Sequence, residues 1–120
     1  MILVDTSVWI DHLHRNDPVL VGLLENEMVG CHRHVIEELA LGSIKRRDSV
    51  LALLENLYQF PALGHAEVMT LIDVRRLWGQ GLSAVDAHLL GAVRVVDGAL
   101  LWTRDKRLRA AAAGDAVAYN

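Results

Sequence analysis

The feature that most constrains this chain is the alternation of very short apolar runs with amphipathic helical patterns. Runs at residues 2–4, 28–31, 58–60 and 99–102 are too short to form helices. Short apolar runs such as Ile2-Leu3-Val4 are typical of strands buried inside a parallel sheet. Strands that alternate with helices predict an α/β fold. We expect a parallel β-sheet of four to five short strands sandwiched between helices, with residues 116–118 as a final edge strand.

Helical spacing of apolar residues and, in several cases, capping residues indicate where the intervening helices begin. Helix starts are predicted near or just after these residues: Ser7, Asp17, His34, Asp48, Ala66, Ser83 and Asp105. Asp17 is followed by Pro18, which suits the first turn of a helix. Ser83 and Asp86 have the spacing of a capping box. Asp48 and Thr103 are expected to act as N-caps of the helices that follow them.

Length and composition narrow the class of protein further. The 120 residues contain no linker-like or repeated segment, so residues 1–120 are predicted to form a single domain. No apolar run approaches the ~20 residues that cross a bilayer, and no basic leader opens the chain. A lone cysteine, Cys31, cannot form an intramolecular disulfide and fits a reducing compartment. We therefore expect a cytoplasmic protein without a membrane segment.

Acidic side chains fall where a parallel sheet would gather them. Asp5 directly follows the first strand, and Asp105 comes shortly after the strand that ends at Trp102. Ligands of open α/β sheets bind at the carboxyl ends of the strands, so these two carboxylates should lie at the functional edge. Asp86, in the first turn of its helix, could point to the same edge or could serve only as a cap. Clustered carboxylates are tolerated when a cation neutralises them, and oxygen ligands favour Mg²⁺ or Mn²⁺.

Several other readings of the same residues remain open or are disfavoured. Thr6 and Ser7 could be no more than helix caps, and composition does not distinguish Glu37 from Glu38. The closely spaced Cys31, His32 and His34 do not match the spacing of a structural zinc site. The chain also has no glycine-rich phosphate loop and no nucleophile elbow.

Four motifs, in order along the chain, resemble those of PIN-domain ribonucleases of the VapC toxin type. The first is the opening Val4-Asp5-Thr6-Ser7-Val8-Trp9-Ile10-Asp11. The second, Glu38-Leu39-Ala40-Leu41-Gly42, is similar to the family's E-L-x-x-G and selects Glu38 over Glu37. The third is Asp86-Ala87-His88-Leu89-Leu90, preceded by Gly81-Leu82-Ser83, and the fourth is Trp102-Thr103-Arg104-Asp105. Together they span nearly the whole chain.

The resemblance implies a single PIN-like domain that is a metal-dependent endoribonuclease. It implies that the acids Asp5, Glu38, Asp86 and Asp105 hold Mg²⁺ or Mn²⁺ and activate water, with Thr6 and Thr103 as supporting hydrogen-bonding groups. It also implies an RNA substrate, the toxin role of a toxin–antitoxin pair, a cognate antitoxin, and a homodimer within a toxin–antitoxin hetero-oligomer. A non-catalytic PIN-like module that binds RNA or a protein is the alternative.

Basic side chains acquire a possible role through the same resemblance. The net charge of −3 argues against binding RNA through overall charge, but an acidic metal site needs cationic side chains at its rim to hold phosphates. Arg46, Arg47, Arg104 and Arg107 are the candidates, and solvated helix faces are the simpler interpretation. The apolar residues Trp9, Leu13, Leu20 and Leu24 could line a partner groove or a dimer surface, or could pack in the core.

Overall fold

The computed structural model describes residues 1–120 and contains one parallel sheet. Its strands are β1 (Ile2–Val4), β2 (Val29–Cys31), β3 (Tyr58–Gln59) and β4 (Leu100–Trp102). They lie in the order β3-β2-β1-β4, and every pairing is parallel. The predicted α/β class with four to five short strands is confirmed. At the expected fifth strand, the chain forms only an isolated parallel bridge between Leu101 and Ala118.

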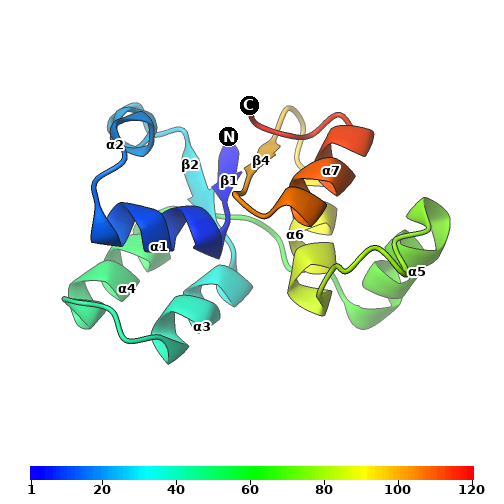
Figure 1. The fold of residues 1–120 in the computed structure, drawn as a ribbon, viewed down its shortest axis with the longest axis horizontal. Helices are drawn as coiled ribbons and strands as arrows, with labels where there is room; N and C mark the ends of the chain where they lie inside the picture. Colours follow the sequence, from blue (N-terminus) through cyan, green and yellow to red (C-terminus); the bar gives the residue numbers. More distant parts are fainter.

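Seven helices enclose this sheet. They are α1 (Thr6–His14), α2 (Pro18–Glu25), α3 (Arg33–Leu41), α4 (Arg47–Asn56), α5 (His65–Arg75), α6 (Ala84–Arg94) and α7 (Lys106–Gly114). In Figure 1, α1 to α4 lie on one side of the strands and α5 to α7 lie on the other, with α5 outermost against α6. None of these helices is both long and apolar enough to span a bilayer.

The order of the strands determines where a site can form. The chain places β2 and β3 on one side of β1 and then crosses to place β4 on the other side. The sheet therefore has its topological switch point between β1 and β4, which is where open α/β sheets bind ligands. Val4 is in register with Trp102, so the next residues, Asp5 and Thr103, are neighbours at the carboxyl ends of these strands.

Two of the predicted helix caps, Asp48 and Thr103, are wrong. Arg46, in the left-handed conformation at φ 52°, occupies the N-cap position of α4 without a side-chain hydrogen bond, so Asp48 falls in the first turn. An acid there still interacts favourably with the helix dipole. Thr103 does not cap α7, because Asp105 accepts the N–H groups of Arg107 and Leu108. This frees the Thr103 hydroxyl for another partner.

The apolar face suggested for a partner is largely consumed by the core. Trp9 and Leu20 are fully buried, and Leu13 and Leu24 are partly buried against the same core. Burial of a side chain of this size stabilises the fold by roughly 1.5–3 kcal/mol, so these residues are needed for folding. Trp9 and Leu20 are therefore unavailable as a docking surface.

We predict opposite effects of adding a methyl group at two glycines. At Gly30 in β2, a Cβ atom would overlap the ring of Phe60 and approach Tyr58 Cδ2 to 3.1 Å. Because Phe60 is buried, Gly30→Ala should lower the free energy of unfolding by about 1–3 kcal/mol. Gly22 in α2 has no atom within 4 Å of the added Cβ, so Gly22→Ala should raise it by about 0.5–1 kcal/mol. Urea denaturation of both variants measures the difference, and equal effects would contradict the close contact at Gly30.

Candidate active site

The Asp5 side chain accepts three hydrogen bonds at the switch point. It is buried, with 7% of its surface exposed, and it follows β1 and caps α1 by accepting the Thr6 N–H at 2.8 Å. Its Oδ2 accepts the Ser7 hydroxyl at 2.8 Å and the Thr103 hydroxyl at 2.7 Å. A carboxylate with this many donors is fixed in both position and orientation.

The same two hydroxyls bind the loop between β4 and α7. The Arg104 backbone N–H donates to Ser7 Oγ at 3.0 Å, and the Asp105 N–H donates to Thr103 Oγ1 at 3.1 Å. Each hydroxyl thus accepts from the loop and donates its only proton to Asp5. The loop that carries Asp105 is therefore tied directly to Asp5.

Glu38, and not its neighbour Glu37, lies beside this site. Thr6 Oγ1 donates to Glu38 Oε1 at 2.6 Å, which joins α3 to the start of α1. Glu37 instead pairs with His34 Nδ1 at 2.7 Å, and this bond holds the pKa of Glu37 below its usual value. The structure therefore separates the two glutamates that composition could not distinguish.

Asp86 faces the site from α6. It completes the predicted capping box, because the Ser83 N–H donates to Asp86 Oδ2 at 2.9 Å and the Asp86 N–H donates to Ser83 Oγ at 3.1 Å. Burial raises the pKa of Asp86, and the nearby charges of Asp5 and Asp105 raise it further against the opposing Ser83 hydrogen bonds. Asp86 is thus both a capping residue and a member of a group of carboxylates that repel one another.

These four carboxylates, Asp5, Glu38, Asp86 and Asp105, form what we call the acid site. As the side chains stand, no three acidic, histidine or cysteine groups surround a point that could hold an ion. The donor chemistry nevertheless suits Mg²⁺ or Mn²⁺, because all the donors are carboxylate oxygens. The raised pKa of Asp86 also shows that its charge is disfavoured there, and a cation would relieve this.

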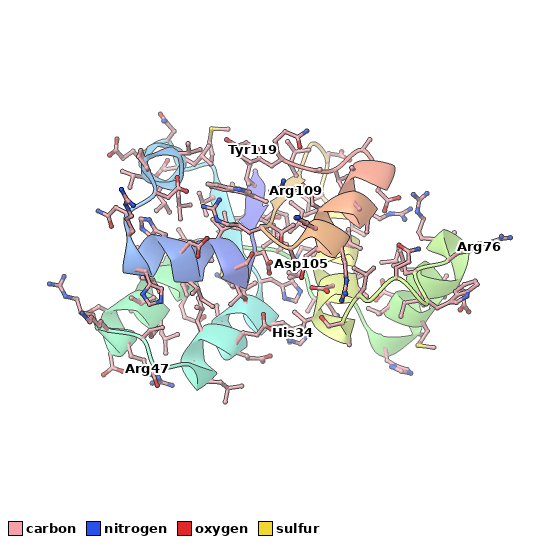
Figure 2. All side chains as sticks on the ribbon, viewed as in Figure 1. His34, Arg47, Arg76, Asp105, Arg109 and Tyr119 are labelled. Atoms are coloured by element: carbon pink, nitrogen blue, oxygen red, sulfur yellow. The ribbon has the colours of Figure 1, made fainter.

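The four basic candidates occupy different places. Figure 2 shows Arg47 at the far end of the molecule from Asp105, and its guanidinium donates to the Ala40 carbonyl at 3.0 Å and 3.2 Å. Arg46 directly precedes it. The structure therefore does not bring Arg46 and Arg47 to the rim of the acid site.

Arg107 and Arg104 lie nearer to the acids. The Arg107 side chain crosses the loop before α6, where a Cβ atom on Gly81 would lie 2.8 Å from its Cδ and Nη1 atoms. Gly81 has φ +76°, so a residue without a side chain suits both its conformation and this approach. Arg104 forms ion pairs with Asp11 and Asp17.

A histidine cluster, His32, His34 and His88, fills the space between α3 and α6. The His34 ring centroid lies 5.0 Å from that of His32 and 4.7 Å from that of His88. His32 Nδ1 accepts the His34 N–H, so the proton of the neutral ring lies on Nε2, which is buried without a partner. Neither nitrogen of His32 is free to bind a metal. Cys31 is buried, which raises its pKa to about 12, so zinc binding at this segment finds no support.

Sequence reasoning underestimated Ser7. It was open to interpretation as a helix cap, but Asp5 performs that role and Ser7 bridges Asp5 to the Arg104 N–H. The one sequence feature that could have indicated this role is that Ser7 lies two residues after Asp5, the acid that ends the first strand. No pattern in the sequence linked it to Arg104, 97 positions away.

Comparison with known proteins identifies the class. The PIN domain family model matches residues 2–114. The fold resembles the crystal structures of PAE2754 from Pyrobaculum aerophilum (TM-score 0.64, 21% identity, 94% of this chain and 85% of the other) and FitAcB from Neisseria gonorrhoeae (TM-score 0.61, 22% identity, 100% and 97%). At these identities the structural likeness concerns the fold alone.

A curated relative narrows the class. Ribonuclease VapC32 of Mycobacterium tuberculosis, present in strains CDC 1551 / Oshkosh and ATCC 25618 / H37Rv, is 66% identical over 118 residues, which cover 98% of this chain and 95% of the relative. The chain therefore belongs to the PIN-domain family and, within it, to the VapC-type ribonucleases. The resemblance inferred from the four motifs is confirmed.

We predict that His32 makes the fold sensitive to mild acid. Burial, together with the charges of His34, His88 and Arg33, lowers the pKa of His32 from 6.5 to about 4. Between these values the unfolded chain binds a proton that the folded chain does not, so stability falls as the pH falls, by up to about 3 kcal/mol. In His32→Asn, which keeps a capping oxygen, this part of the slope of unfolding free energy against pH should disappear.

His65→Asn is the matched control, since His65 is exposed at the start of α5. Its slope between pH 7 and pH 4.5 should equal that of the wild type. Equal slopes in all three proteins would show that His32 protonates as readily in the folded chain as in the unfolded one.

Proposed function

We propose that this protein is a metal-dependent endoribonuclease that acts as the toxin of a toxin–antitoxin pair. The observation that carries the proposal is the convergence of Asp5, Asp86 and Asp105, from three elements of the fold, on the switch point of the sheet. The name of the 66% identical relative, a VapC ribonuclease, supports RNA hydrolysis as the reaction.

Different side chains of the chain would have different roles in such a reaction. Asp5, fixed by Ser7 and Thr103, would be the principal cation ligand, and Asp86, Asp105 and Glu38 would complete the set. A divalent cation bound there would supply polarisation of the scissile phosphate and a water of lowered pKa. Burial and its neighbours raise the pKa of Asp86, so a bound cation would favour the charged form of this carboxylate. Thr6 would keep Glu38 oriented toward the site.

RNA binding needs positive charge beside these acids. Arg107, exposed at the start of α7 and laid across Gly81, is the arginine whose position best suits a phosphate of the substrate. An antitoxin could use the same acid site, because an arginine fork pairs well with clustered carboxylates. We also propose that the protein forms a homodimer within the toxin–antitoxin complex.

Removal of single carboxylates tests the catalytic proposal. With Mg²⁺ or Mn²⁺, Asp5→Asn and Asp86→Asn should each cleave RNA about 100-fold or more slowly than the wild type, because each removes charge that holds the cation. Asp86→Asn should melt at the same or a higher temperature, since it relieves repulsion and keeps an oxygen for the capping box. The measurement is the cleavage rate of single-stranded RNA, with melting temperature as the check on folding.

Asp73→Asn is the control, because Asp73 is an exposed carboxylate on α5. It should cleave as fast as the wild type, and EDTA should stop both. Cleavage that continues in EDTA would refute the metal dependence of the reaction. Full activity of Asp5→Asn would show that Asp5 is not a catalytic residue. A wild type that binds RNA but never cleaves it would favour the non-catalytic module.

The contribution of Arg107 is tested by salt dependence. In an Asp5→Asn background, Arg107→Gln should weaken RNA binding regardless of base sequence and reduce the slope of log affinity against log salt by about 0.7. Arg76→Gln, at the far side of the molecule in Figure 2, should leave the slope unchanged. An unaltered slope in Arg107→Gln would assign this side chain to loop packing alone.

A further inference from the structure

The Arg104 side chain is held between two carboxylates. Its Nε lies 2.6 Å from Asp11 Oδ2 and its Nη2 lies 2.7 Å from Asp17 Oδ2. The guanidinium also lies over the Trp102 ring, 5.7 Å from the centroid. Burial by itself would raise the pKa of Asp17, but the Leu20 N–H, the Arg104 guanidinium and the Val19 N–H together hold it below its usual value.

The backbone of the same residue reaches the acid site. The Arg104 N–H donates to Ser7 Oγ, and Ser7 Oγ donates to Asp5 Oδ2. Ser7 and Asp11 are four residues apart in α1, so they share one face of that helix. Arg104 therefore lies along this face with its backbone on Ser7 and its guanidinium one turn further on.

This arrangement leaves little of Arg104 for RNA. A phosphate would have to displace two carboxylates that already engage the guanidinium at short distances. The two carboxylates come from different elements, since Asp11 belongs to α1 and Asp17 caps α2. Arg104 thus fixes the β4–α7 loop to both helices on that side of the acid site.

We propose that Arg104, Asp11 and Asp17 form a clamp that positions Ser7 and Thr103 on Asp5, so that Arg104 is a positioning residue of the nuclease and not an RNA ligand. This inference rests on the proposed function. A planar fork is required because a lysine ammonium cannot present the same pair of directed donors to two carboxylates.

The clamp contributes to geometry more than to stability. Arg104, Asp11 and Asp17 keep 38%, 56% and 17% of their side-chain surface exposed. Ion pairs with a partner as exposed as Arg104 typically contribute about 1 kcal/mol or less to folding. A displaced loop, in contrast, moves Thr103 and the Arg104 N–H away from the hydroxyl bonds that orient Asp5. Loss of the clamp should therefore lower activity in a protein that melts normally.

The test compares Arg104→Gln with Asp17→Asn, which keeps a side-chain oxygen to cap α2 and removes only the charge. Each should lower kcat for RNA cleavage about ten-fold, with KM and melting temperature close to wild type. The double variant should be no slower than Arg104→Gln, because both changes open one clamp. Arg104→Lys should recover only part of the loss. Mn²⁺ affinity, measured by electron paramagnetic resonance without RNA, should fall in parallel.

Arg15→Gln is the matched control, since Arg15 is an exposed arginine between Asp11 and Asp17 in sequence, while the ion pairs of both carboxylates are with Arg104. It should match the wild type in kcat and Mn²⁺ affinity. The clamp is overturned if Arg104→Gln raises KM and flattens the salt dependence of RNA binding while Asp17→Asn does neither. It is also overturned if both variants keep wild-type kcat. A wild type that neither cleaves RNA nor binds Mn²⁺ overturns the proposed function itself. This outcome depends on the wild-type protein alone, so it is distinguishable from failure of the clamp.

Discussion

The two hydroxyl bonds that converge on Asp5 Oδ2 are the interaction on which the rest of this site depends. The Ser7 and Thr103 hydroxyl oxygens that make them lie 3.4 Å from each other, although these residues are far apart in sequence. The parallel register of β1 with β4 makes this possible, because it places Asp5 beside Thr103. A buried carboxylate is stable only when its oxygens are satisfied, so the pairing of the strands and the burial of Asp5 support each other.

The charged side chains fall into two groups: carboxylates gathered at the acid site, and ion pairs or hydrogen bonds that join elements of the fold. Around the acid site, burial and the charges of Asp5 and Asp105 raise the pKa of Asp86, and the proposed cation would offset this effect. Elsewhere, arginines bind acids or carbonyls and hold elements together: Arg75 and Arg94 both pair with Asp115, and Arg47 binds the end of α3. Five of the twelve basic side chains, those of Arg47, Arg75, Arg94, Arg104 and Arg109, are engaged in this way.

Local features of the sequence predicted what local physics determines. Apolar runs gave the strands, Asp17-Pro18 and Ser83 gave helix starts, and strand-terminal acids indicated the edge where Asp5 and Asp105 lie. The failures were tertiary. Arg46 and not Asp48 occupies the N-cap position of α4, and Asp105 and not Thr103 caps α7. The Arg104 pairs depend on how α1, α2 and the β4–α7 loop meet, which no single segment encodes.

The most direct measurement of the central claim is a crystal structure with Mn²⁺, using its anomalous scattering to locate the ion. The account predicts a peak bonded to the Asp5 carboxylate at the edge shared with Asp86 and Asp105, with Ser7 and Thr103 still donating to Asp5. A peak at the histidine cluster instead, or none at the acid site with saturating Mn²⁺, would contradict it.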